Sequence, residues 1–75
     1  MNTFVSGLKI GHIGTISSFT DDYIASKLMT MGVLPGSSVQ LIRVAPFKGG
    51  YYLKVDGMSM VVRETEASSI VLEIH

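Results

Sequence analysis

Apolar and polar residues alternate with the two-residue period of a β-strand through much of the second half of the chain. Tyr51–Val55 and Met58–Arg63 are two such segments, and Asp56-Gly57 joins them. A two-residue type I′ turn needs positive φ at both positions, so Asp-Gly between two strand patterns predicts a β-hairpin. The turn fixes the register and places six paired side chains on the core face. The pairs are Val55 with Met58, Leu53 with Met60 and Tyr51 with Val62.

Three further segments have strand patterns. β-Branched and aromatic residues are concentrated in Thr15–Phe19, and Ser38–Ala45 ends before a proline that has no N–H to donate to a ladder. Ile70–Ile74 alternates isoleucine and leucine toward the core. A short polar helical turn is expected over Glu64–Ser69. The glycine-containing segment Leu8–Gly14, ahead of the first of these strands, is expected to be extended.

One helix is predicted between Asp21 and Gly32. Asp21 or the preceding threonine can cap its N-terminus. Ile24, Leu28 and Met31 lie at i, i+4 and i+7 and form one apolar stripe. Gly32 can adopt the left-handed conformation that ends a helix without a Cβ clash.

A tight turn follows this helix. With Gly32 at C′, the residues at C″ and C3 are Val33 and Leu28, the apolar pair that accompanies a Schellman cap. Pro35-Gly36 then supplies the φ angles of a type II turn. So many apolar side chains at one corner indicate that the corner is either buried or a docking surface.

The docking hypothesis centres on Leu34, the first residue of the type II turn. Its side chain projects at the corner, and it has fewer ways to reach the core than its apolar neighbours. A leucine held on a rigid turn beside a flexible methionine suits the centre of an interface. The alternative is that Leu34 plugs an open end of the fold, and the sequence leaves both open. The predicted partner-binding residues are Met29, Val33, Leu34 and Pro35.

Composition adds a reason to expect a partner. The 75 residues form one small domain, residues 1–75, with 47% apolar and only 16% charged residues, against about 25% charged in an average soluble domain. A chain of this length buries only about 60% of the surface that its unfolded form exposes. A partner protein or a homo-oligomer would cover the apolar surface that remains.

Charge and apolar runs bear on the location of the protein. Six basic residues balance six acidic ones, and the basic residues are scattered, so little is available to neutralise nucleic-acid phosphates. No cysteine is present, which fits a reducing compartment. The apolar runs are too short to span a bilayer, and no signal peptide pattern is found. A cytoplasmic protein is expected.

Candidate catalytic and metal-binding residues are few. His12 and His75 have no partner at a metal-ligand spacing, and nothing requires Glu64 or Glu66 to approach His12. The glycines do not form a phosphate-binding loop, and no nucleophile elbow is found. Catalytic, cofactor-binding and metal-binding residues are therefore all expected to be absent. The methionines expected to fill the core, rather than to bind metal, are Met31, Met58 and Met60.

The order of these motifs resembles the FeoA family, the small accessory protein of bacterial ferrous iron transport. The resemblance covers nearly the whole chain, and its most specific part is the Gly-Val-Leu-Pro-Gly segment. Asn2–Ser6 has no family signature, and the loop over residues 47–50 is less distinctive than in the family. The residues that carry the resemblance are Leu8, Gly11, Gly14-Thr15-Ile16, Lys27-Leu28, Met31–Val39, Ala45-Pro46, Val62-Arg63, Glu66-Ala67 and Ile70-Val71.

The resemblance implies a mainly β fold, a small SH3-like five-stranded β-barrel with one α-helix inserted after the first strand. It also implies a non-enzymatic cytoplasmic protein that docks on the membrane GTPase–transporter of the Feo system and modulates it. The same domain resembles the C-terminal module of iron-dependent repressors. The alternative is therefore an SH3-like module of a metal-dependent repressor or a nucleic-acid-binding domain. A chaperone that itself binds iron lacks a ligand set, so the resemblance implies at most a transient association with Fe²⁺ and no bound cofactor.

Overall fold

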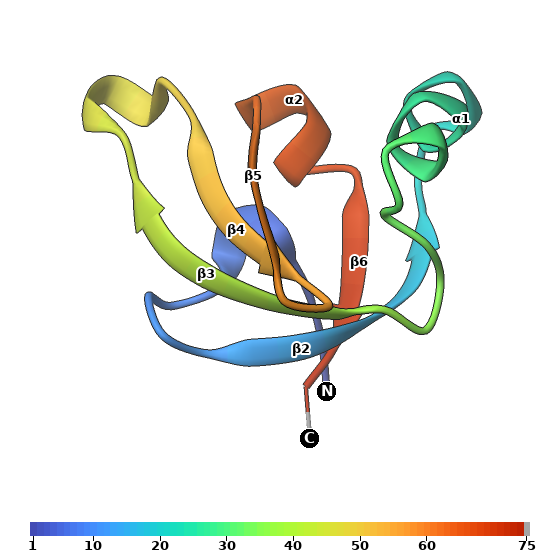
Figure 1. Ribbon diagram of the computed structural model, residues 1–75, viewed down its shortest axis with the longest axis horizontal. Coiled ribbons are helices and arrows are strands. Elements are labelled where there is room, and N and C mark those ends of the chain that lie inside the picture. Colours follow the sequence, from blue (N-terminus) through green and yellow to red (C-terminus); the bar gives the residue numbers. More distant parts are fainter. Residues whose placement is uncertain (75) are drawn as a thin grey trace.

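The computed structural model describes residues 1–74. One curled antiparallel sheet forms most of the molecule (Figure 1). Its six strands lie in the order β1-β6-β2-β3-β4-β5, so β1 and β5 are the two edges. The strands are β1 (Asn2–Phe4), β2 (Ile13–Phe19), β3 (Ser38–Val44), β4 (Tyr51–Val55), β5 (Met58–Val62) and β6 (Ile70–Glu73). The helices are α1 (Asp22–Thr30) and α2 (Glu64–Ala67), with 3₁₀ turns η1 (Val5–Gly7) and η2 (Pro46–Lys48).

The predicted fold class is confirmed, with two differences in detail. The expected five strands are six, because β1 pairs with β6 through Thr3 opposite Leu72. A three-residue strand is too short to show a period of two, so its pairing is visible only in the folded chain. The sheet is strongly curled but its two edges do not pair, so the barrel is open. Of the two histidines, His12 is exposed and His75 lies outside the described residues.

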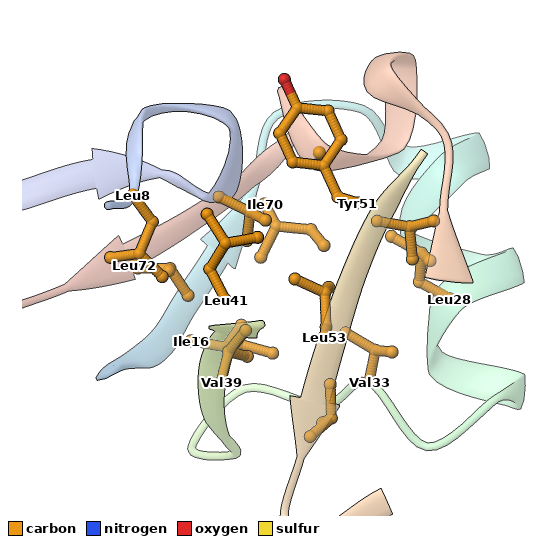
Figure 2. Packing of buried hydrophobic residues seen from close by; sticks show 14 residues of the cluster. Leu8, Ile16, Leu28, Val33, Val39, Leu41, Tyr51, Leu53, Ile70 and Leu72 are labelled. Atoms are coloured by element: carbon orange, nitrogen blue, oxygen red, sulfur yellow. The ribbon is translucent and has the colours of Figure 1, made fainter. Parts of the chain in front are cut away.

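The core fills the concave side of the curled sheet (Figure 2). Side chains from the five strands β2 to β6 meet there, and Leu28 of α1 and Leu8 close the two sides. Because alternate strand residues face the same side, β4 and β6 each contribute every second residue. The largest fully buried side chains are Ile16, Leu28, Leu41, Leu53, Ile70, Leu72, Val5, Val33, Val39, Val55 and Val62.

The β4–β5 hairpin has the predicted register throughout, from Val55 opposite Met58 to Tyr51 opposite Val62. Asp56 has φ 48° and Gly57 has φ 85°, as a type I′ turn requires. The prediction that every inward residue is core is wrong for Met58, whose side chain is 56% exposed. Met58 lies beside the turn, at the end of the sheet, where the core no longer covers it. Met31 was likewise expected in the core and is 41% exposed, because the helix has already ended at Thr30.

Candidate docking surface at the helix–turn corner

The corner that follows α1 is built from local hydrogen bonds. At the start of the helix, the carboxylate of Asp21 accepts a hydrogen bond from the backbone N–H of Ile24 at 2.9 Å. At its end, Val33 N–H donates to Leu28 C=O and Gly32 N–H donates to Met29 C=O, both at 3.1 Å. These two bonds are the Schellman motif that the sequence predicts, and Gly32 has the required positive φ of 93°.

The turn that follows is fixed to the sheet. Ser37 N–H donates to Leu34 C=O at 2.9 Å, and Gly36 has φ 91°, so the type II turn is confirmed. Gly36 N–H donates to Ile16 C=O at 2.8 Å, and Ile16 N–H donates to Ser37 C=O at 2.9 Å. The turn is therefore held against β2 and presents its outer side chains from a rigid frame.

Burial divides the four predicted partner-binding residues into two groups. Leu34 is 46% exposed and Met29 is 39% exposed, and Pro35 is also exposed. Val33 differs from the expectation, because its side chain is fully buried together with Leu28. The Schellman cap turns Val33 back toward the helix, so it supports the corner from beneath and does not face a partner.

Two further methionines extend this surface. Met31 follows the helix on the same segment, and Met58 reaches it from the hairpin. A Cβ added to Gly32 would lie 3.7 Å from Met58 Cε, so the Met58 side chain lies over the helix cap. We call the five exposed residues Met29, Met31, Leu34, Pro35 and Met58 the apolar corner. The sequence pattern missed Met31 and Met58, since periodicity places both with the core residues.

An ion pair sets the position of α1 against α2. The Lys27 ammonium lies 2.9 Å from Glu66 Oε2, and the backbone N–H of Arg63 donates to Glu66 Oε1 at 2.8 Å. Burial by itself would raise the pKa of Glu66. The Arg63 hydrogen bond and the Lys27 charge outweigh this effect and lower that pKa from its usual value. The helix that carries Met29 is therefore fixed at the end nearest the corner by a charged contact.

Glu64 has a different partner on the same short helix. The buried Tyr51 hydroxyl donates to Glu64 Oε2 at 2.9 Å. Burial of the ring raises the pKa of Tyr51, and the hydrogen bond to Glu64 and its negative charge raise it further. Because the phenol keeps its proton, this contact serves the packing of β4 against α2.

Residues 1–74 contain neither a cluster of metal ligands nor a membrane-spanning helix. No group of three or more histidine, cysteine, aspartate or glutamate side chains is arranged to hold a metal ion there. His12 is exposed, and Glu66 is engaged by Lys27 and Arg63. In the same range, no helix has the length and apolar character needed to cross a bilayer.

Solved structures with the same fold include iron-transport proteins and repressors. A FeoA-like protein from Clostridium acetobutylicum has a TM-score of 0.87 at 22% identity, covering 97% of this chain and 86% of that one. The FeoA protein from Chlorobium tepidum has a TM-score of 0.85 at 26% identity, covering 96% and 70%. A manganese-dependent transcriptional repressor has a TM-score of 0.87 at 14% identity, covering 99% of this chain but 42% of the repressor.

The sequence comparison agrees with the structural one. The signature of the FeoA domain matches residues 5–74, which is nearly the whole chain and includes the helix cap, the type II turn and the hairpin. The chain belongs to the FeoA domain family.

Proposed function

We propose that this chain is a cytoplasmic, non-enzymatic accessory protein of ferrous iron uptake that docks on the cytoplasmic part of the membrane GTPase–transporter. Membership of the FeoA family implies a role in ferrous iron transport. The observation that carries the docking proposal is the apolar corner, where Leu34 is 46% exposed on a turn bonded at both sides to β2.

The energetics of the corner favour a protein partner. Burying an exposed leucine side chain contributes up to about 2 kcal/mol, and the frame that holds Leu34 is already ordered, so little conformational entropy is lost on binding. Met29, Met31 and Met58 surround it with flexible, polarisable side chains that adapt to an opposing surface. A rigid anchor surrounded by adaptable side chains is a suitable centre for an interface.

The test is the affinity of the purified chain for the separately expressed cytoplasmic domain of the transporter. Leu34→Ser is expected to weaken binding by about tenfold or more, a loss of roughly 1.4 kcal/mol, with little change in melting temperature. Ile10→Ser is the matched control, since Ile10 is 64% exposed and lies outside the apolar corner. The control is expected to bind like the parent chain.

Two results would count against the proposal. If Leu34→Ser loses several degrees of melting temperature and still binds normally, Leu34 is structural and the docking surface lies elsewhere. If the parent chain shows no binding to the cytoplasmic domain, docking itself is rejected. Calorimetry with GTP tests the non-enzymatic part, because nucleotide binding tighter than millimolar would overturn it.

A second candidate function rests on the likeness to the manganese-dependent repressor. On that reading the chain is an SH3-like module that acts beside a DNA-binding domain. Its formal net charge of zero argues against a direct contact with DNA. Retention of the chain on a DNA column in the presence of Mn²⁺ or Fe²⁺ would favour the repressor reading, whereas binding to the transporter domain favours docking.

A further inference from the structure

The two edge strands of the sheet, β1 and β5, differ in how well they are protected against pairing with another chain. Natural edges are protected by short length, charged residues, proline or a bulge. β1 has only three residues. β5 has five residues, Met-Ser-Met-Val-Val, with no charge and no proline. Its pairing with β4 runs from Val55–Met58 to Tyr51–Val62 with no shift of register. β5 is therefore a regular and unprotected edge.

Two residues of β5 present free backbone groups along this edge. The two-residue turn makes Val55–Met58 a hydrogen-bonded pair, and such pairs alternate along an antiparallel ladder. The backbone N–H and C=O groups of Met58, Met60 and Val62 consequently point toward β4. Those of Ser59 and Val61 point away from it. Among the described residues, β5 pairs only with β4, and the backbone groups of Ser59 and Val61 make no other hydrogen bond. In Figure 1, β5 lies beside β4 and leads into α2.

A hollow lies on the outer face beside this edge. Its volume is about 330 Å³. The β3 strand contributes Ile42 as the extra residue of a bulge, because Leu41 pairs with Leu53 and Arg43 with Tyr52. Ile42 and Val61 are 42% and 51% exposed, so the hollow has accessible apolar walls. The lining residues are Ile42, Tyr52, Leu53, Ser59, Met60 and Val61.

The same face carries two cations without a carboxylate partner. The Arg43 guanidinium lies 4.3 Å from the centre of the Tyr52 ring, and Lys54 is exposed opposite Ser59. Within residues 1–74, neither cation forms an ion pair. The acidic residues at the two ends of β5 are engaged elsewhere: the carboxylate of Asp56 accepts from Ser38 N–H, and Glu64 accepts from Tyr51. Arg43 and Lys54 therefore place two positive charges without ion-pair partners on this face.

We propose that β5 accepts an extended acidic segment of another protein as an added strand. The N–H and C=O groups of Ser59 and Val61 supply the backbone hydrogen bonds. One apolar side chain of the added strand fills the hollow at Val61. A carboxylate two residues along, opposite Ser59, faces Lys54. Backbone pairing supplies affinity and the alternate side chains supply selectivity, as in strand addition generally. This surface is separate from the apolar corner, so the proposal does not depend on the proposed function.

The probe is an acetylated and amidated peptide of about seven residues, with valine and glutamate alternating on one face and threonine between them. Titration is followed by amide NMR of the full chain. The amides of Ser59 and Val61 are expected to shift and to gain protection from hydrogen exchange. The same peptide with lysine in place of glutamate is expected to bind at least about tenfold more weakly.

Val61→Pro is the decisive variant. It removes an outward N–H and leaves the bonds to β4 in place, since Val61 belongs to a non-hydrogen-bonded pair. Peptide binding is expected to be lost while the far-UV spectrum stays that of the parent chain. Val61→Thr, which keeps the N–H, is the matched control and is expected to retain binding. Lys54→Glu is expected to make the lysine peptide bind more tightly than the glutamate peptide. The backbone groups of Ser59 and Val61 stay available in this variant.

Other outcomes reject the proposal. If Val61→Pro is misfolded, N-methylation of the peptide backbone at alternate positions replaces it, and undiminished binding then excludes strand addition. Equal binding of the glutamate and lysine peptides excludes an acidic segment. A concentration-dependent dimer that disappears in Val61→Pro assigns the edge to a second copy of this chain. Shifts of Ser59 and Val61 by a single-stranded oligonucleotide but not by the peptide assign the face to nucleic acid.

Discussion

Two connections in this chain place a proline and glycines beside an exposed apolar side chain. They differ in which residues have positive φ: glycines in one connection, and residues with a side chain in the other. Between α1 and β3 the positive φ values fall on Gly32 and Gly36, at 93° and 91°. Between β3 and β4 they fall on Phe47 and Lys48, at 58° and 55°, whereas Gly49 has φ −71°. Left-handed backbone costs a residue with a Cβ about 1–2 kcal/mol. The first connection is therefore relaxed and the second is strained.

The strain of the second connection is imposed by what flanks it. Ala45 N–H donates to Gly50 C=O at 2.8 Å, and Val44 pairs with Tyr51. Once β3 and β4 pair, the residues between Ala45 and Gly50 must close the loop. Strand pairing and burial of the neighbouring core thus dictate the backbone of Phe47, whereas the corner after α1 is dictated by its own residues. A connection with glycine at the required positions needs no such help.

The two connections also differ in how they are attached to α2. Lys27, near the end of α1, contacts the buried Glu66 at 2.9 Å. Lys48, in the strained loop, lies 4.0 Å from Glu64, and both side chains are substantially exposed. Exposed ion pairs contribute little because water and salt screen them. The same short helix therefore braces the first connection and hardly affects the second.

The largest expected effect comes from removing the support beneath the corner. Leu28→Ala deletes a fully buried side chain that packs under the Schellman cap and is expected to destabilise the domain by about 3 kcal/mol. Phe47→Ala is the matched variant in the other connection, and its side chain is 103% exposed. Its stability is expected to change by less than about 0.5 kcal/mol. Urea denaturation measures both, and similar losses would contradict the contrast.

The two ion pairs to α2 are compared by neutralising each lysine. Lys27→Gln leaves the buried Glu66 carboxylate with one hydrogen bond and is expected to lose about 1.5 kcal/mol at neutral pH. The native pKa of Glu66 is lowered from its usual value. The stabilisation is therefore present at pH values above the unfolded-state pKa and is lost as pH falls through the native pKa. The difference between Lys27→Gln and the parent chain is therefore expected to shrink in acid.

Lys48→Gln is the control for the ion-pair comparison. Its partner Glu64 lies 4.0 Å away at the surface. The free energy of unfolding is therefore expected to change by less than about 0.5 kcal/mol, both at neutral pH and in acid. Thermal melts from neutral pH into acid measure both variants. A loss for Lys27→Gln that persists unchanged at the lowest pH would show that the contact acts through packing of the lysine stem and not through charge.

The relaxed backbone at the corner is tested by adding a Cβ to Gly32. The added atom would meet Met58 Cε at an ordinary 3.7 Å, so the expected loss for Gly32→Ala, about 1 kcal/mol, arises from the positive φ alone. Gly32→Asn is the control, because asparagine tolerates the left-handed region better, and a smaller loss is expected. Equal stability of Gly32→Ala and the parent chain in denaturation would mean that the helix cap contributes nothing.

The smallest expected effect is a gain. Phe47→Asn replaces a strained, fully exposed residue with one that accepts left-handed φ, and a stabilisation of about 0.5 kcal/mol is expected. Phe47→Ala, which keeps the strain, provides the reference. If both variants have the same midpoint in urea denaturation, the left-handed backbone at residue 47 does not lower the stability of the native state.

Several features of the fold could be predicted from the sequence because their causes lie within a few residues. The Asp21 cap, the Gly32 helix end and the type II turn each depend on side chains and φ preferences less than six residues apart. The β4–β5 register follows from Asp56-Gly57 alone. Such local preferences act in any context that allows the chain to fold.

The candidate site was predicted in part, and the tertiary structure supplied the rest. The exposure of Leu34 and Met29 agrees with the sequence hypothesis, while their contact with a partner stays a prediction. Periodicity states which side of an element a residue faces, but not whether another element covers it. That limit explains why Met31 and Met58 are exposed, whereas the burial of Val33 follows from its pairing with Leu28 in the helix cap.

The sequence by itself determined where the helix, the turns and the hairpin begin and end, because each is encoded by neighbouring residues. Tertiary structure alone decided that Asn2–Phe4 becomes an edge strand on β6 and that Phe47 is held in a strained conformation. It also decided that β5 keeps an open edge beside a hollow. These features arise where segments far apart in the chain meet in space. The side-chain pattern of a strand shows which face is buried, but it does not specify which strand is its hydrogen-bonding partner.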